Sequence, residues 1–381
     1  MGGGGEEIYQ IGLTRTPGIG LAHAKKLINH FGSASEVFRA KKDELLSVGL
    51  REEPARAILA FSDHAAVESE LRLLASKEIR LLFFTDPDYP RRLLSIPDAP
   101  PVLFYRGKAD LNTKKILSVV GTRTADDYGK QMTANLIRQL VQPIQQLAQP
   151  GLLVVSGLAF GIDAAAHTAA MANRLPTVAV LAHGLGTIYP TQHKAMTDAM
   201  AEEGGLLTAL EYHVRAERFH FPERNKWVAG MCDALLVVET GKAGGSMLTV
   251  TDAVRYGKRI FAVPGRVTDH RSAGCNWLIR QGTAEMVSSG QELMAAMGWE
   301  WPAGGAGAQT MMEFGSAADG SVSAEDRLMG LLREKESPAI DELVACSHLD
   351  ASAVALSLLN LELRGSVRSL PGKRYTLAAG G

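Results

Sequence analysis

The sequence predicts an α/β protein built around an extended Rossmann-like, doubly wound and mostly parallel sheet. Short runs of apolar, often β-branched residues alternate with helical patterns over residues 81–297, which is typical of a parallel sheet covered by helices on both faces. The residues before this region show helical periodicity, and residues 323–378 show three helices and a hairpin. We therefore expect a small all-helical N-terminal domain and a C-terminal winged helix to flank the sheet.

The first domain, residues 1–75, is expected to consist of short helices. Apolar residues recur at helical spacing over residues 21–31, 35–38 and 55–73. Residues 16–20 contain one proline and two glycines, which cannot continue a helix and therefore form a tight turn. The turn and the basic helix after it resemble a helix-hairpin-helix or SAM-like unit. Such a unit either contacts DNA phosphates through its turn amides or serves as a packing or protein-contact module.

The central domain, residues 76–300, carries the predicted sheet. The strand candidates are residues 81–85, 116–120, 152–155, 177–181, 234–239 and 259–263. Helical patterns lie between them, for example over residues 129–148 and 163–173. Ligands bind such sheets outside the carboxyl ends of the strands, so the loops that follow the strands are the places to search for a site.

The C-terminal part begins with residues 301–322, which are rich in glycine, alanine and serine and predict a flexible linker. Residues 323–381 are expected to form a winged helix of the DML1-like type. Its helices are predicted at residues 324–333, 339–344 and 351–364, and its hairpin strands at residues 366–370 and 374–377. The third helix is mainly apolar and has little capacity to read bases, which favours weak DNA contact or partner binding.

Composition limits the function classes. The 40 basic residues are balanced by 41 acidic ones, giving a net charge of −1, so a site for a polyanion must come from local clustering of charge. Three widely spaced cysteines provide neither a disulfide framework nor zinc-site spacing, and they suit a reducing compartment. No apolar run reaches the roughly 20 residues of a membrane helix, and no apolar signal segment opens the chain. We expect a cytoplasmic protein with no membrane partner.

Glycine follows five of the predicted strands. The loops concerned are residues 121–124, 156–163, 183–186, 240–246 and 264–266. Glycine allows a phosphate to approach backbone N–H groups, and the N-terminus of the next helix favours an anion. These loops predict a polyanionic ligand, although tight strand-to-helix turns are the alternative for any single loop. A dinucleotide fingerprint with its acidic partner and a P-loop are both missing, so we expect no NAD, no nucleotide hydrolysis and no other cofactor.

Basic and aromatic residues belong to the same edge of the predicted sheet. They are Arg123, Lys194, Phe221, Arg224 and Lys226. Cations bind phosphates and an aromatic ring stacks on a base, which is the usual combination for binding single-stranded nucleic acid. The alternative for each cation is an ordinary solvated surface charge.

Several polar residues have both a chemical and a structural interpretation. Arg224 and the adjacent Asn225 alternatively cap a helix and pin a carboxylate, either Asp163 or Glu239. Asp163 and His167 lie four residues apart, yet no third ligand suggests a metal site, so we expect a structural role. Ser156 lacks the GxSxG context of a nucleophile, and we expect it to cap a helix.

Ordered motifs over about 200 residues resemble the DprA/Smf (DNA-processing protein A) family. The clearest are residues 100–107, 120–123, 156–163, 221–225, 245–249 and 261–265. The resemblance implies a non-catalytic protein that binds single-stranded DNA and forms a homodimer. It also implies loading of the RecA recombinase during natural transformation and displacement of single-strand-binding protein. Its phosphate-binding residues, carried over position by position, are Gly121, Arg123, Gly157, Arg224, Asn225, Gly245, Ser246 and Thr249, with Lys194 and Phe221 as weaker matches.

The chain departs from the family pattern at three positions. Lys226 stands where arginine is common, Gly244 where serine is common, and Cys275 where a hydroxyl residue is usual. A lysine holds phosphate less specifically than the bidentate guanidinium. The alternative function is a nucleotide-binding enzyme related to nucleoside-monophosphate phosphoribohydrolases, with Asp163 or Glu239 as the acid–base group. The Pro-Gly-Gly-x-Gly-Thr loop usual in such enzymes is missing from this sequence.

Overall fold

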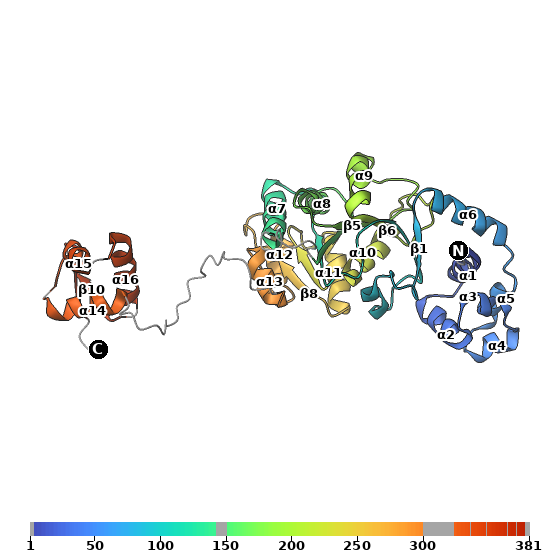
Figure 1. Ribbon diagram of the computed structural model, residues 1–381, viewed down its shortest axis with the longest axis horizontal. Coiled ribbons are helices and arrows are strands. Elements are labelled where there is room, and N and C mark those ends of the chain that lie inside the picture. The colour runs from blue at the N-terminus through green and yellow to red at the C-terminus, as the bar shows by residue number, and fades with distance from the viewer. Residues whose placement is uncertain are drawn as a thin grey trace. The chain divides into compact units, whose positions relative to one another are not determined.

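A computed structural model describes residues 4–141, 151–299, 324–335, 337–347, 349–363, 365–370 and 372–377. The chain forms two compact units, residues 1–305 and 306–381, which we describe separately (Figure 1). The linker predicted at residues 301–322 lies outside the described residues, as does the end of the helix predicted at residues 129–148.

The N-terminal part of the first unit is helical, as predicted. Its helices are α1 (Gly4–Arg15), α2 (Leu21–Phe31), α3 (Ala34–Arg39), α4 (Lys42–Ser47), α5 (Glu52–Leu59) and α6 (His64–Ser76). The predicted turn lies between α1 and α2, with Gly18 at a φ of 81°. The helical spacing noted over residues 55–73 belongs to two helices, because the chain breaks between α5 and α6. At this break Phe61 packs on Phe38, 4.9 Å between ring centroids, and against Gly12.

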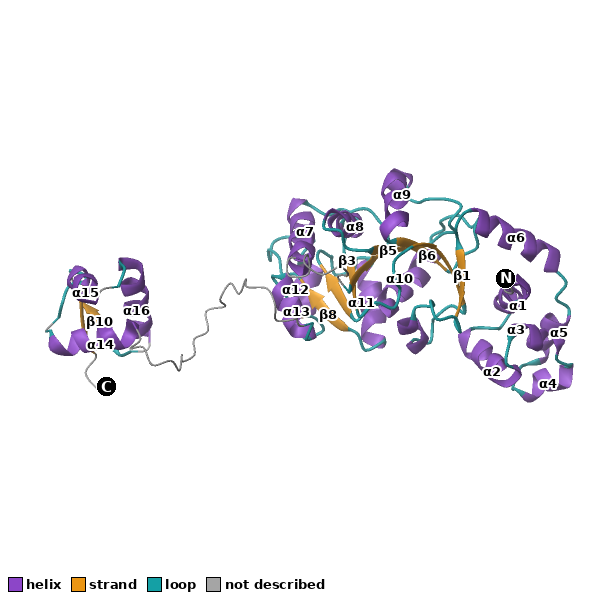
Figure 2. Cartoon of the chain, in the orientation of Figure 1, coloured by secondary structure: helices purple, strands orange, loops and turns teal. Residues whose placement is uncertain are grey.

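The sheet has nine strands in the order β1-β2-β6-β5-β4-β3-β7-β8-β9 (Figure 2). Their bounds are β1 (Arg80–Phe83), β2 (Val102–Gly107), β3 (Lys115–Val120), β4 (Leu152–Ser156), β5 (Thr177–Val180), β6 (Gly205–Thr208), β7 (Ala234–Val237), β8 (Arg259–Ala262) and β9 (Glu285–Met286). Pairing is parallel from β6 to β9 and antiparallel between β1, β2 and β6, which confirms a mostly parallel sheet. Strands β2, β6 and β9 are not among the strands predicted from the sequence.

Helices cover both faces of this sheet, as a doubly wound fold requires. One face packs against α7 (Asp127–Val141), α8 (Ile162–Ala172) and α13 (Gly290–Met297), and the other against α10 (His220–Met231), α11 (Ser246–Arg255) and α12 (Ala273–Arg280). Alternate residues of β3 serve the two faces: Leu117 and Val119 join the first core, and Ile116 and Val120 join the second. Helix α9 (Lys194–Glu203) covers β5 and β6.

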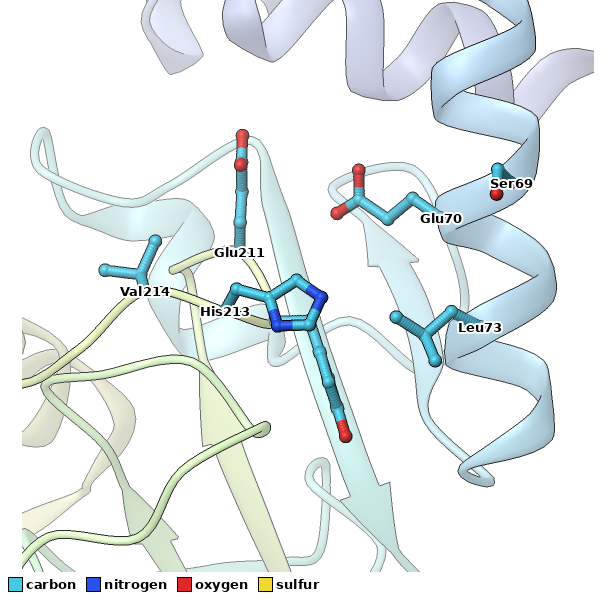
Figure 3. A pocket seen from close by; sticks show the side chains of 7 residues that line it. Ser69, Glu70, Leu73, Glu211, His213 and Val214 are labelled. Atoms are coloured by element: carbon cyan, nitrogen blue, oxygen red, sulfur yellow. The ribbon is translucent and has the colours of Figure 1, made fainter.

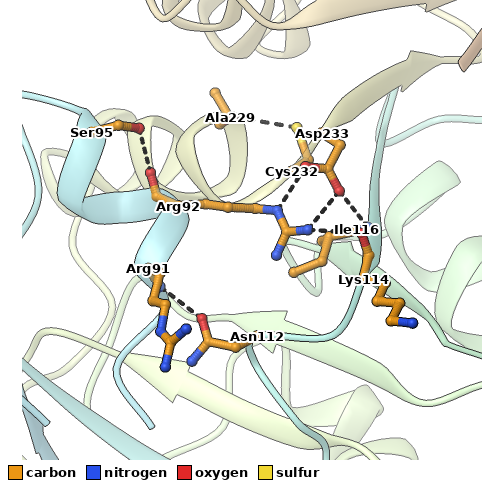
Figure 4. Close-up of polar contacts among 9 residues, drawn as sticks. All are labelled: Arg91, Arg92, Ser95, Asn112, Lys114, Ile116, Ala229, Cys232 and Asp233. Carbon is orange, nitrogen blue, oxygen red and sulfur yellow. Dashed lines mark hydrogen bonds and ion pairs between the residues drawn. The ribbon is translucent and has the colours of Figure 1, made fainter. Parts of the chain in front are cut away.

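A clamp holds the amino ends of the central strands together (Figure 4). Arg92, in the short 3₁₀ helix η1 (Arg91–Ser95), donates two hydrogen bonds to the carboxylate of Asp233, at 2.7 and 2.8 Å. Asp233 precedes β7 and also accepts the amide of Ile116 at the start of β3, at 2.9 Å. The clamp therefore fastens η1 to the edge of the sheet opposite the predicted site.

The second unit has three helices and a hairpin in the predicted order. They are α14 (Ala324–Glu334), α15 (Ile340–Ser347), α16 (Ala351–Leu363), β10 (Val367–Leu370) and β11 (Arg374–Leu377). The helices share a core around Leu328, Leu343 and Leu358, and the two strands pair antiparallel. Among the described residues, no single helix has the length and apolarity to cross a membrane; only the pair α15 and α16, bent by 115°, meets both conditions together.

Candidate nucleic-acid interface

A cavity of about 460 Å³ lies at the carboxyl ends of β3, β4 and β7. The loops after these strands, the second and third turns of α10 and the first turn of α11 form most of its wall. The structure brings together here most of the predicted site residues: Gly121, Arg123, Gly157, Arg224, Asn225, Gly245, Ser246 and Thr249. The topology explains this convergence, since parallel strands deliver their carboxyl ends to one edge of the sheet.

The glycines of the wall have two different roles. A Cβ atom on Gly121 would collide with Ile162, and one on Gly157 would collide with the guanidinium of Arg224, so these two glycines allow close packing. A Cβ atom on Gly245 would meet no atom within 4 Å. Gly245 lies immediately before α11, so the open space there exposes the amide end of that helix, a position that favours anions.

Hydroxyl groups line the same end of the cavity. Ser246 donates a hydrogen bond to the hydroxyl of Thr240 at 2.7 Å, and Thr249 lies one turn further along α11. Thr122 and Thr240 also line the cavity, although neither is among the site residues predicted from the sequence. Their position in the loops that follow two predicted strands was the available signal for both.

Arg224 is buried, with 4% of its surface exposed. Its Nη1 donates to the carbonyl oxygens of Gly157 and Val180, and its Nε donates to Asn225 Oδ1 at 3.2 Å. Burial lowers the pKa of Arg224 to about 10, while the nearby carboxylate of Asp163 raises it, so the group stays charged at neutral pH. Among the described residues Arg224 makes no ion pair or hydrogen bond with Asp163 or Glu239, so the expected pinning of a carboxylate is limited to the effect of the Asp163 charge on the pKa of Arg224. Its Nη2 makes no hydrogen bond within the described residues and remains for a ligand in the cavity.

Arg123, unlike Arg224, has no polar partner in the described protein. Its side chain makes no hydrogen bond or ion pair with any residue that the structure describes, and its guanidinium carbon lies 5.1 Å from the ring centroid of Phe221. Tyr189 contacts the same ring edge-on at 6.0 Å. Tyr189 and Phe160 are both about half exposed and border a second small hollow that shares Arg123 and Arg224 with the cavity. The unpaired guanidinium of Arg123 therefore lies close to aromatic rings, two of which are exposed to solvent.

The structure does not bring Lys194 or Lys226 into the cavity. Lys194 starts α9 and pairs with Asp198 at 2.9 Å, beside a separate hollow. Lys226 pairs with Glu223 at 2.8 Å. Arg224, Asn225 and Lys226 are consecutive on α10, and successive residues of a helix point about 100° apart, so the three cannot share one face.

His167 and Ser156 have structural roles. His167 is fully buried, its Nδ1 lies 2.7 Å from Thr177 Oγ1, and burial lowers its pKa to about 3. The expectation that Ser156 caps a helix is wrong. Its hydroxyl donates to the carbonyl of Val119 at 2.6 Å, within the sheet, because Ser156 is the last residue of β4 and points toward β3.

A wider hollow, of about 600 Å³, lies between α6 and residues 211–214 (Figure 3). Its wall includes the carboxylates of Glu70 and Glu211, which both pair with Arg15. Two carboxylates with one shared guanidinium repel a polyanion. This hollow is therefore unsuitable for phosphate.

Known proteins match the chain over most of its length. The family model described as DNA recombination-mediator protein A matches residues 80–298, and the one described as the DprA winged helix domain matches residues 313–373. The chain belongs to the DNA recombination-mediator protein A family. The resemblance drawn from the sequence motifs is confirmed.

Individual members of the family agree with this assignment. Protein Smf of Synechocystis is 29% identical over 97% of this chain and 98% of its own length. The X-ray structure of DNA processing protein A from Streptococcus pneumoniae superposes with a TM-score of 0.65 at 30% identity, over 76% of this chain and 97% of that one. DNA processing protein A from Helicobacter pylori, described for its single-stranded-DNA-binding mode, superposes with a TM-score of 0.52 at 26% identity, over 59% and 98%.

Proposed function

We propose that this protein binds single-stranded DNA in the cavity at the carboxyl ends of β3, β4 and β7. One observation carries the proposal: glycine-lined backbone, the unbonded cation of Arg123 and the exposed rings of Phe160 and Tyr189 meet at one edge of the sheet. Amides and cations bind phosphate, and rings stack on unpaired bases. The bases of a duplex are already stacked on each other, so a single strand suits this edge better.

The proposed contacts involve the backbone of the nucleic acid and the faces of its bases. Such contacts carry little sequence information, so we expect little preference among base sequences. The net charge of −1 restricts the attraction to the local cations. Affinity should therefore fall as salt rises, with a modest slope. The Helicobacter pylori relative, described by its single-stranded-DNA-binding mode, supports the proposal.

We infer that the protein acts in recombination as a non-catalytic mediator. In this role a homodimer protects incoming DNA, displaces single-strand-binding protein and loads the RecA recombinase during natural transformation. Membership of the recombination-mediator family supports the inference. We also propose the division into residues 1–75, 76–300, 301–322 and 323–381 as the working domain map, with DNA contact centred in the second of them.

The arrangement of acidic groups supports a binding role rather than the enzymatic alternative. Asp163 lines the cavity, but its carboxylate accepts the amide of Ala159 at 3.2 Å and faces the guanidinium of Arg224. Glu239 is fully buried and is not part of the cavity wall. We expect incubation with nucleoside monophosphates to release no free base; release of base would favour the alternative.

The decisive experiment measures binding of the full chain to an oligo-thymidine strand over a range of salt concentrations. Arg123→Ala should weaken binding at least about tenfold and reduce the slope of log affinity against log salt by about one, because one phosphate contact is lost. Lys194→Ala is the matched control and should change affinity little, since its ammonium group lies outside the cavity and pairs with Asp198. Equal affinities for Arg123→Ala and the wild type would remove this cavity as the DNA site.

A further inference from the structure

Three carboxylates from three separate segments meet beside the loop that carries Arg123. Asp126 precedes α7, Glu239 follows β7, and Asp269 lies in the loop after β8. One oxygen of each carboxylate lies within 4.8 Å of the other two. None of the three residues lines the phosphate cavity, so the proposed DNA contacts do not account for them.

Glu239 provides a second observation that points to a ligand. Its side chain is fully buried, and its Oε1 has no hydrogen-bond partner among the described residues. Its Oε2 accepts the amide of Asp126 at 3.3 Å. The carboxyl group lies directly against Gly129, where any Cβ atom would collide with it. A buried carboxylate oxygen without a partner is unfavourable unless the carboxyl group takes up a proton or a positive group reaches it.

The protein supplies only part of the required positive charge. Arg271 is placed against the cluster with its Nη1 3.6 Å from Asp126 Oδ2, and His270 Nδ1 lies 3.7 Å from Asp269 Oδ1 but is positive only when the ring is protonated. The Nε of Arg271 is already bonded to the carbonyl oxygen of Thr124, at 3.1 Å. A single guanidinium therefore faces three carboxylates, and the cluster is left with an excess of negative charge.

We propose that Asp126, Glu239 and Asp269 bind one divalent metal cation through a carboxylate oxygen each. All three donors are hard oxygens, which suit Mg²⁺, Mn²⁺ or Ca²⁺ and not the thiolate-seeking metals. The three segments that supply these oxygens are far apart in the sequence, so the ion acts as a cross-link between them.

The site would reinforce the segment that presents Arg123. The carbonyl oxygen of Glu239 accepts the amide of Thr122 at 2.6 Å, and Asp126 closes the same segment three residues after Arg123. A cation held by Glu239 and Asp126 therefore fastens both ends of residues 122–126 to the end of β7. This inference concerns a cation and does not depend on the proposed DNA binding.

The test is a titration of the metal-free full chain with Mn²⁺, without DNA because phosphates bind Mn²⁺ themselves. Loss of the electron paramagnetic resonance signal of free Mn²⁺ reports binding. We expect one saturable ion per chain, displaced by excess Mg²⁺ or Ca²⁺. Asp269→Asn and Glu239→Gln should each weaken binding at least about tenfold, since removal of even an outer-sphere partner commonly has that effect.

Of the two variants, Asp269→Asn is expected to disturb the fold less. Asp269 is partly exposed, and an amide oxygen still accepts the N–H of Arg271, as Asp269 Oδ1 does at 2.9 Å. Asp198→Asn, on the surface of α9, is the matched control and should leave Mn²⁺ binding unchanged. The proposal is overturned if the wild type shows no saturable Mn²⁺ binding, or if Asp269→Asn binds as tightly as the wild type. If Glu239→Gln does not fold, Asp269→Asn decides the question alone.

Discussion

Arg224 combines a structural and a binding role in one side chain. Its guanidinium donates to the carbonyl oxygens of Gly157 and Val180, and the residue also lines the cavity. A lysine has neither the fork nor the number of donors to replace it. Arg123 differs, because its side chain makes no hydrogen bond or ion pair with the described residues. Arg224 therefore shapes the cavity, whereas Arg123 is available to bind a ligand.

We predict that Arg224→Gln lowers both stability and DNA affinity. Removing this guanidinium leaves the buried carbonyl oxygens of Gly157 and Val180 without their donor, which typically costs about 1–3 kcal/mol. Urea unfolding of the full chain measures the free energy, and oligonucleotide titration measures the affinity. Arg123→Ala is the control, with a stability change within about 0.5 kcal/mol. Equal stability of Arg224→Gln and the wild type would contradict the structural role.

Glu239 should make stability depend on pH when divalent cations are chelated. Burial and the neighbouring Asp126 carboxylate raise the pKa of Glu239 from 4.5 to about 7. Between these two values the folded protein holds a proton that the unfolded chain has released, so stability falls as pH rises from about 4.5 to about 7. The amide in Glu239→Gln does not titrate in this range, so the variant lacks this dependence of stability on pH.

The measurement compares urea midpoints of wild type and Glu239→Gln at pH 5 and pH 7.5 with a chelator present. The variant should gain stability relative to the wild type at the higher pH. Other titrating groups, including His167, are present in both proteins, so the difference isolates Glu239. A difference that stays constant across this range would show that Glu239 is ionised in the folded protein throughout.

At the scale of elements, the two ends of the central strands are specialised. The carboxyl ends hold the cavity, and the amino ends hold the clamp between Arg92 and Asp233 (Figure 4). The clamp therefore fixes the amino ends of β3 and β7 relative to each other at the edge opposite the cavity.

We predict that Asp233→Ala destabilises the protein by about 1–3 kcal/mol, because the buried amide of Ile116 loses its acceptor and Arg92 keeps only the carbonyl oxygen of Lys114. Equilibrium unfolding in urea provides the value. The control is Asp198→Ala, which removes an exposed ion pair of α9 and should cost no more than about 0.5 kcal/mol. DNA affinity at low salt should be the same in both variants, since neither residue lines the cavity.

At the scale of the whole molecule, the two units have separate cores. The helices of the second unit pack around Leu328, Leu343 and Leu358, and the sheet has its own two cores. Every residue that lines the proposed DNA cavity belongs to the first unit. In α16, Leu356 and Leu359 are about half exposed, an apolar surface that suits a protein partner better than a phosphate backbone.

A chain ending at residue 305 should therefore retain DNA binding. We expect its affinity for an oligo-thymidine strand to lie within about threefold of the full chain, a difference of less than 1 kcal/mol. Fluorescence anisotropy at one fixed salt concentration measures both proteins. A loss of affinity far beyond this range would assign a main DNA contact to the second unit.

Short-range sequence patterns predicted much of the fold and of the cavity wall. Apolar runs marked most of the central strands, and glycine after each of them marked the edge where Gly121, Gly157 and Gly245 now line one cavity. Helical periodicity and the terminal hairpin marked both flanking regions. These features are readable because side-chain periodicity and backbone permissiveness depend on residues close together in the chain.

Only the tertiary structure decided the rest. Whether Lys226 joins Arg224 in the cavity depends on the rotation of α10 about its axis, and the strands β2 and β6 are defined by partners far away in the sequence. The break at Phe61 and the meeting of Asp126, Glu239 and Asp269 also come from packing between distant segments. The direction of a side chain, the pairing of a strand and the burial of a group depend on residues that are distant in the sequence. The order of residues along the chain does not reveal these neighbours.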